Sequence, residues 1–294
     1  MKRLAALLLA TTLGAAELPP VMATIYPLQV LTTLVVERPQ QVGLLIDAAT
    51  GCPHDHALTP QERSAITRSR VVVANGAGLD KSVTALLGPD QRLIDTSLAI
   101  PANERLEDDH DHDHDHGHHH DHGPNPHFFA SPRLAARQVL AIGEALATAD
   151  PAGAVGYRRR ATDAADRLVR LAEDLRAACA PLPRRHVVLQ HDSLAYLARD
   201  AGLEVVAVMQ EEPGQEPSAA TLTALIATAR QHRAVVLAEP QFASRSPALV
   251  AREAGVPLAV IDPLVSGAAQ PGADLYERTM RANLERLVTA LRTP

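Results

Sequence analysis

The segment HVVLQHDSLAYLARDAGLEVVAVM, residues 186–209, has the pattern that decides the fold. It begins with a short run of valine and leucine (186–190), continues through a stretch of helical composition (192–200), and ends in a second aliphatic run (204–209). Short apolar runs of this kind fit strands that are covered on both faces, and an intervening helix makes such neighbouring strands parallel. The segment therefore predicts a strand–helix–strand unit within a parallel sheet.

The same alternation continues on both sides of this segment. In the C-terminal part, we expect further strands at 234–239 and 257–262, with helices at 218–231, 245–254 and 272–292. In the N-terminal part, we expect strands at 21–25, 41–46, 71–75 and 92–94, with helices at 27–37, 60–68 and 79–87. The pattern predicts the α/β class, with two βα lobes that each contain a parallel-type sheet.

A long helix is expected between the two lobes. Residues 157–180 contain no proline or glycine, and Leu168, Leu171 and Leu175 recur at helical spacing. A helix of about 25 residues is about 37 Å long, enough to run along both lobes. We therefore expect an N-terminal lobe at 17–150, a linking backbone helix at 151–182 and a C-terminal lobe at 183–294. A coiled coil is the alternative, but the apolar repeat covers too few heptads.

The N-terminus has the pattern of a secretory signal peptide at residues 1–16. Lys2 and Arg3 precede an apolar run (4–13), and small residues lead into Glu17. The apolar run is too short to span a bilayer, and no later segment reaches the roughly 18 apolar residues of a membrane helix. No cysteine follows the expected cleavage site, so none is available there for lipid attachment. We expect an exported protein in a Gram-negative periplasm.

Composition excludes some classes of partner and leaves one question open. The formal net charge is −6, with 2% aromatic residues and no tryptophan. Nothing basic or rich in aromatic residues indicates nucleic-acid binding, and the cores must be aliphatic. Cys52 and Cys179 are the two cysteines. An oxidising compartment permits a disulfide between them, although small buried hydrophobic residues are the alternative that we favour.

Residues 107–122 read EDDHDHDHDHGHHHDH and contain eight of the fourteen histidines of the chain, with seven carboxylates. The histidines are His110, His112, His114, His116, His118, His119, His120 and His122. Such a tract has little apolar surface to bury, so we expect a solvated, mobile loop. Its composition is typical of metal binding, and we expect low-affinity auxiliary sites. A solvated acidic linker is the alternative; an expression tag fits poorly, because the tract is internal.

Three histidines outside this tract lie between an expected strand and the helix after it: His54, His127 and His191. Asp262 lies at the matching position after the strand 257–262. Open parallel sheets place ligand sites at such loops, and three imidazoles with one carboxylate suit tetrahedral Zn²⁺. A single loop histidine is more often a surface or capping residue, so each signal is weak alone.

The residues around these positions suggest other roles for their neighbours. Asp192 follows His191 and is expected to cap the next helix. His186 and His232 are expected to be structural, and His56 is a spare ligand or a solvated neighbour of His54.

At these residues the chain resembles the zinc/manganese-type (cluster A-I) solute-binding proteins of bacterial ABC transporters. The resemblance is closest to zinc-uptake members with a His-rich loop, and it covers nearly the whole chain after the signal peptide. The matching segments are IYPLQVL, PHDHALTPQERSAITRSRVVVANGAGLD, NPHFFASPRLAARQVLAIGEAL, QHDSLAYLARDAGLEV, EPSAATLTALI, AEPQF and VIDPL. Together these segments are specific to the family, although none of them is specific alone.

The resemblance implies that His54, His127 and His191 bind the metal and that Asp262 is the fourth ligand. Some zinc-specific members complete the site with a glutamate or water instead, but Pro53 precedes His54 here and removes the adjacent glutamate. Histidine at the third position, where manganese-specific relatives have glutamate, favours Zn²⁺ over Mn²⁺. The implied partners are a membrane permease with its cytoplasmic ATPase, and a periplasmic metallochaperone is a further candidate. We expect a monomer that captures zinc and catalyses nothing.

Two other functions remain as alternatives. A periplasmic zinc store or chaperone would need no transporter. A zinc hydrolase would use three protein ligands and a water, with Glu211 or Glu239 as general base. The sequence contains neither an HExxH helix nor a nucleophile motif, so a hydrolase is the weaker alternative.

Overall fold

The computed structural model describes residues 21–48, 56–107, 123–210 and 216–293, and their strands form two four-stranded parallel sheets. The N-terminal sheet has the order β2-β1-β3-β4 and consists of β1 (Val21–Ala23), β2 (Val42–Leu44), β3 (Val71–Ala74) and β4 (Arg92–Asp95). The C-terminal sheet repeats this order as β6-β5-β7-β8 and consists of β5 (His186–Leu189), β6 (Glu204–Val208), β7 (Val235–Ala238) and β8 (Leu258–Val260). The predicted α/β fold with two parallel-sheet lobes is confirmed.

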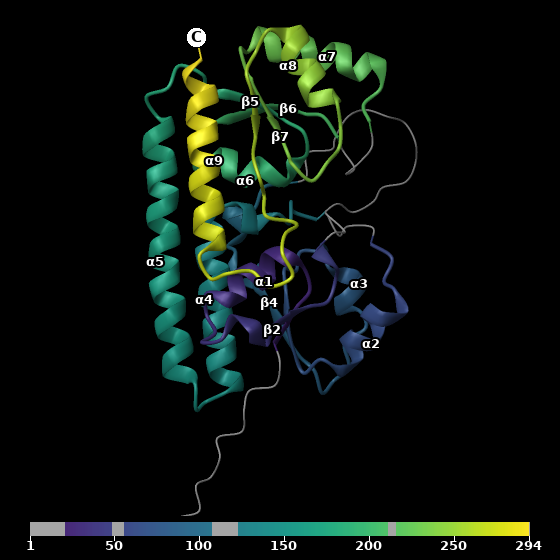
Figure 1. The fold of residues 1–294 in the computed structure, drawn as a ribbon, viewed down its shortest axis with the longest axis vertical. Helices are drawn as coiled ribbons and strands as arrows, with labels where there is room; N and C mark the ends of the chain where they lie inside the picture. Colours follow the sequence, from purple (N-terminus) through teal and green to yellow (C-terminus); the bar gives the residue numbers. More distant parts are fainter. Residues whose placement is uncertain (1–20, 49–55, 108–122, 211–215, 294) are drawn as a thin grey trace, which may run out of the picture.

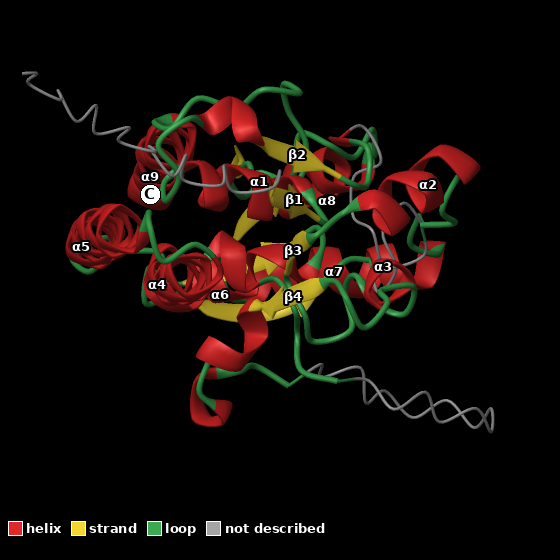
Figure 2. Cartoon of the chain, turned by 90° about the horizontal axis from the view of Figure 1, so that it is seen from below, coloured by secondary structure: helices red, strands yellow, loops and turns green. Residues whose placement is uncertain are grey.

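Helices lie on both sides of each sheet, as buried parallel strands require. In the N-terminal lobe, α1 (Tyr26–Thr33) and α4 (Pro132–Ala149) lie on one side, and α2 (Pro60–Arg68) and α3 (Lys81–Thr84) lie on the other (Figures 1 and 2). In the C-terminal lobe, α6 (Ala195–Asp200) lies opposite α7 (Ala219–Gln231) and α8 (Ser246–Ala254) (Figure 1).

Two long helices extend alongside both lobes: α5 (Ala154–Cys179) and the C-terminal α9 (Leu275–Arg292) (Figure 1). The predicted leucines of α5, at 168, 171 and 175, are all buried. One apolar cluster contains these leucines, Val73 of the N-terminal sheet and Val187 of the C-terminal sheet. Because a single close-packed core includes both sheets, their relative position is fixed by packing.

The structure differs from the sequence expectations mainly in where helices begin and end. The helix expected at 79–87 is the short α3, and the one expected at 27–37 ends at Thr33, before the buried β-branched Val35 and Val36. Branching at Cβ restricts such side chains in a helix. The helix expected at 192–200 begins as a 3-10 turn, η6 (Asp192–Leu194). Among the described helices, none combines the length and the apolar character of a membrane span.

Cys179 at the end of α5 is a buried free cysteine. Burial raises the pKa of its thiol to about 11, so the thiol stays protonated and unreactive at neutral pH. Cys179 therefore behaves as the small hydrophobic residue that we favoured, while Cys52 lies outside the described residues.

The N-terminus of α2 has a capping box, in which Thr59 Oγ1 accepts a hydrogen bond from Glu62 N and Glu62 Oε2 accepts one from Thr59 N. We expect Thr59→Ala to lower the free energy of unfolding by about 1 kcal/mol, because Glu62 N loses its acceptor and the Glu62 carboxylate loses the hydroxyl that helps to hold it. Urea denaturation measures this change. Thr162→Ala is the control, since that exposed hydroxyl only donates to Arg158 O within α5. Equal losses in the two variants would contradict the prediction.

Candidate metal centre

The segment 125–127 lies between the carboxyl ends of the two sheets. Asn75, which directly follows β3, donates from Nδ2 to Pro126 O at 2.8 Å. Asn125 donates from its own Nδ2 to Asp192 O at 3.2 Å, just beyond the end of β5. Both β3 and β5 lie in the middle of their sheets, where the strand order changes direction and open sheets form ligand sites. Residues 125–127 therefore connect the carboxyl ends of the two central strands, β3 and β5.

His127 is completely buried at the start of η5 (Phe128–Ala130). Asn125 Oδ1 accepts a hydrogen bond from His127 N at 2.9 Å and lies 3.0 Å from His127 Nδ1. A backbone N–H can only donate, so Asn125 Oδ1 must be the accepting atom of that amide. His127 Nδ1 therefore carries a proton, and Nε2 presents the lone pair that a metal needs.

His191 lies two residues beyond Leu189, the last residue of β5, and is 3% exposed. The ring centres of His127 and His191 are 5.2 Å apart, and the ring planes meet at 82°. Two imidazoles that bind one tetrahedral ion at 2.0–2.1 Å have ring centres about 5 Å apart. Edge-to-face contacts with Phe129 and Phe242 cover the two rings and shield them from water. The spacing of the two histidines therefore suits one shared ion.

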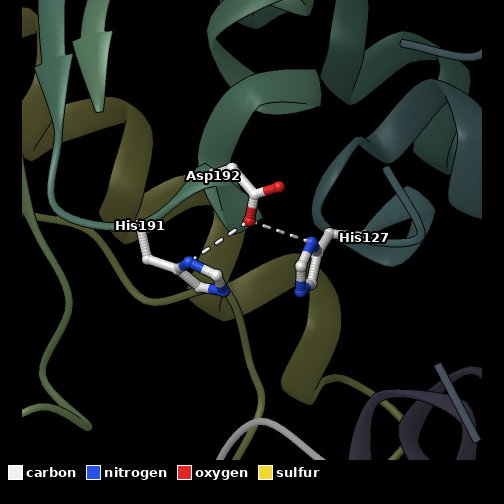
Figure 3. A group of neighbouring side chains, drawn as sticks. All are labelled: His127, His191 and Asp192. Atoms are coloured by element: carbon white, nitrogen blue, oxygen red, sulfur yellow. Dashed lines mark ion pairs between the residues drawn. The ribbon is translucent and has the colours of Figure 1, made fainter. Parts of the chain in front are cut away.

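Asp192 completes a group of three side chains, each with a ligand atom within 4.8 Å of the other two. Among the described residues this is the one such group of His, Cys, Asp or Glu. Asp192 Oδ1 lies 3.2 Å from His191 Nδ1 and 3.5 Å from His127 Nδ1. Figure 3 shows the carboxylate on the Nδ1 side of both rings, with the second nitrogen of each ring on the other side.

Asp262 is not part of this group, although it follows β8 as the sequence predicts. Its Oδ1 accepts hydrogen bonds from Gln241 Nε2 at 2.7 Å and Leu264 N at 2.8 Å. The side chain of Asn283, on α9, makes two hydrogen bonds to the backbone of Asp262. Its Oδ1 accepts from Asp262 N, and its Nδ2 donates to Asp262 O. These contacts hold Asp262 in place, and no described residue donates a hydrogen bond to its Oδ2.

A buried carboxyl group, Glu239, lies behind the histidines at the end of β7. Burial, with smaller contributions from the charges of Asp192 and Asp262, raises its pKa to about 8, although Ser193 Oγ donates a hydrogen bond to Oε1 at 2.6 Å. Glu239 is therefore neutral near pH 7. The charge effects also indicate that Asp192 and Asp262 both lie near this carboxyl.

The remaining histidines lie away from this group or outside the described residues. His54 and the eight tract histidines are outside the described residues. His186 and His232 contact each other with ring centres 5.1 Å apart, and His186 Nε2 lies 3.4 Å from Glu204 Oε2. His56 Nε2 bonds to Glu62 at 2.9 Å, in the capping box of α2. Of the four ligands expected from the sequence, the structure thus brings His127 and His191 together.

Sequence reasoning missed the roles of Asn125 and Asp192. Asp192 was expected to cap a helix, but the N-cap of η6 is His191 without a side-chain hydrogen bond, and the Asp192 carboxylate faces the two histidines. The sequence did contain one sign of these roles, because Asn125 lies two positions before His127 and Asp192 lies one position after His191.

A family model described as "Zinc-uptake complex component A periplasmic" matches residues 21–290. The chain is 30% identical over 278 residues to the "High-affinity zinc uptake system protein ZnuA" of Bacillus subtilis strain 168, covering 92% of this chain and 87% of that protein. It is 27% identical to the "Zinc-binding protein AdcA" of Streptococcus pyogenes serotype M6 (strain ATCC BAA-946 / MGAS10394), but spans only 55% of its length.

Solved structures are similar over almost the same part of the chain. A crystal structure of ZnuA is 27% identical, with a TM-score of 0.75 over 92% of this chain and 98% of that one. The solute-binding protein FpvC of Pseudomonas aeruginosa, solved with Ni²⁺, is 29% identical, with a TM-score of 0.75 over 92% of this chain and 96% of that one.

Proposed function

The chain belongs to the family of periplasmic components of zinc-uptake complexes, and on that premise we propose that it captures Zn²⁺ between its lobes with His127 and His191 as ligands. The observation that supports this most is the pair of buried rings, 5.2 Å apart, whose Nδ1 atoms both face Asp192. Neutral nitrogen ligands favour Zn²⁺ over Mn²⁺. Proton competition for them should weaken binding as the pH falls.

His54 and Asp262 are the proposed remaining ligands. The assignment of Asp262 is supported by its position after β8 and by the two hydrogen bonds that hold its Oδ1. His54 rests on the family resemblance, because it lies outside the described residues. Together these four residues would supply three nitrogen donors and one oxygen donor, a set that suits tetrahedral zinc.

Delivery to a membrane permease driven by an ATPase is the proposed next step, after export directed by residues 1–16. A family of solute-binding proteins has no need for catalysis, which makes the hydrolase the weaker alternative. Glu239, one candidate base of that alternative, is a buried carboxyl whose pKa burial raises to about 8 in the metal-free protein. Glu211, the other candidate base, lies outside the described residues.

Competition titration of the purified protein with Zn²⁺, Mn²⁺ and Cu²⁺, together with growth of a deletion strain in chelator, tests this proposal. We expect one tight zinc site and a growth defect that added zinc repairs. Several comparable zinc sites with normal growth in chelator would instead support zinc storage. Measurable hydrolysis by the zinc-loaded protein would support an enzyme.

Hydrogen bonds among Leu106, Asn125 and Tyr196 join the chain before the His-rich tract to the chain after it, and we call this group of contacts the neck. Asn125 N donates to Leu106 O at 2.9 Å, and the Tyr196 hydroxyl accepts from Leu106 N and donates to Asn125 O, at 2.9 and 2.8 Å. The backbone on both sides of the tract is thus fixed by contacts of described residues. A set of weak sites tethered to the chain close to His127 would act on the metal centre at high effective concentration.

Deleting residues 107–122 is expected to leave one tight zinc site and to slow zinc loading when zinc is scarce. The neck contacts do not depend on the deleted residues, whereas the auxiliary sites are lost. Stopped-flow loading from a buffered zinc pool measures the rate, and a variant with all eight tract histidines replaced by serine separates chemistry from loop length. A deletion variant that loads as fast as the parent would contradict the role in loading.

A further inference from the structure

Asp192 faces the same nitrogen of two candidate ligands from opposite halves of the molecule. Its Oδ1 lies 3.2 Å from His191 Nδ1, in the C-terminal half, and 3.5 Å from His127 Nδ1, in the segment that leads into α4 (Figure 3). The carboxylate is 13% exposed, and the two imidazoles are 4% and 0% exposed. In such a poorly solvated place, a carboxylate acts strongly on the groups that face it.

Asn125 fixes both Asp192 and His127. Its Nδ2 donates to Asp192 Oδ2 at 2.9 Å, and its Oδ1 accepts from His127 N at 2.9 Å. The second bond fixes the orientation of the amide, because the backbone N–H cannot accept. The same Oδ1 must then accept the proton of His127 Nδ1, 3.0 Å away. The amide thus determines which nitrogen of His127 is protonated.

We propose that Asn125, through its hydrogen bonds, and Asp192, through the attraction of its charge, are positioning residues that hold His127 and His191 as their Nδ1–H tautomers before zinc arrives. Both Nε2 lone pairs are then directed to the ion, and Asp192 itself is not a ligand. This inference rests on the proposed function, because it assumes that these two histidines bind the zinc. Outer groups that orient metal-ligating imidazoles increase the basicity of these ligands, and their loss typically lowers metal affinity by about 10- to 100-fold.

The arrangement also links the two halves of the site through contacts between protein groups. Asn125 and His127 precede α4, whereas His191 and Asp192 follow β5. The Asn125–Asp192 hydrogen bonds therefore help to hold His127 beside His191 through protein contacts alone. Ligands that are already oriented lose less conformational freedom on binding, which improves affinity.

The test uses Asp192→Asn and Asn125→Ala in the full-length protein, with Asp166→Asn on the exposed face of α5 as the charge-matched control. Long-range ¹⁵N–¹H spectra of the metal-free proteins report the tautomer of each ring, and chelator competition reports zinc affinity. We expect Nδ1–H at both histidines in the parent and the control. In Asp192→Asn the His191 tautomer should change, in Asn125→Ala the His127 tautomer should change, and both variants should bind zinc about 10- to 100-fold more weakly.

Three results would overturn the proposal. These are Nε2–H tautomers in the metal-free parent, zinc affinity of Asp192→Asn within twofold of the parent, and X-ray absorption that shows one zinc ligand fewer in Asp192→Asn. The last result would make Asp192 a ligand. A parent protein that binds no zinc would refute the proposed function instead. The spectra of the metal-free protein would still show which nitrogen of each histidine carries the proton. Matching thermal melts of the metal-free variants exclude misfolding as the cause.

Discussion

Zinc affinity is expected to fall by roughly 100-fold or more when His191 is replaced by alanine, and by a similar factor in His127→Ala. Four-ligand zinc sites in small proteins have apparent binding free energies of about 10–16 kcal/mol, so one ligand contributes about 3 kcal/mol on average. Each 1.4 kcal/mol corresponds to about tenfold in affinity. Both rings are buried and lie at the spacing of a shared ion, so a water molecule is a poor substitute for either.

Chelator competition measures these affinities, and the most useful controls are histidines of the same lobe. His186→Ala and His232→Ala remove rings that contact each other at the start of β5 and the end of α7. We expect both control variants to bind zinc as the parent does. His54→Ala and Asp262→Ala extend the series to the ligands that rest on the family resemblance. Tight binding by His127→Ala or His191→Ala would refute the site.

The metal-free protein is expected to lose a few kcal/mol of stability as the pH rises from about 5 to 8, and Glu239→Gln should remove most of that loss. Burial raises the pKa of Glu239 to about 8 from an ordinary value of 4.5. Between these values the folded protein holds a proton that the unfolded chain releases, so raising the pH favours unfolding. The stabilisation is complete below pH 4.5 and is lost as the pH approaches 8.

Urea denaturation of the metal-free protein across this pH range measures the effect. Glutamine keeps the shape of the side chain and can accept the hydrogen bond from Ser193 Oγ, but it does not ionise. Glu253→Gln is the matched control, because that side chain is 50% exposed and the substitution makes the same chemical change at the surface. A stability profile that Glu239→Gln leaves unchanged would show that this carboxyl is already charged in the folded protein.

The sheets were predictable because their strands are short aliphatic runs with helices between them. VVVAN (71–75) contains β3 and PLAVID (257–262) contains β8, each within two residues of its ends. The strand order and the shared core were not predictable, since apolar periodicity says which face of an element is buried but not which partner buries it. Helix ends also depended on context, as the short α3 shows.

For the site, sequence position identified the loops but not the atoms that meet. His127 and His191 follow from the rule that ligands gather where parallel strands end, and the structure places them together. Asp192 looked like a helix cap because Asp is common at that position after a strand. Its actual neighbour is His127, 65 positions away in the chain, and such a long-range contact leaves no local signature.

The neck between Leu106 and Asn125 has a consequence for how this protein can vary. Leu106 and Asn125 are joined by a hydrogen bond of 2.9 Å. The two ends of the intervening segment are therefore held together by contacts outside that segment. For a closed loop, each doubling of length costs only about 0.6 kcal/mol in chain entropy. Insertions, repeats and losses of histidine there should be nearly neutral for folding. The position is accordingly a natural place to graft a foreign peptide, such as a reporter that signals metal occupancy.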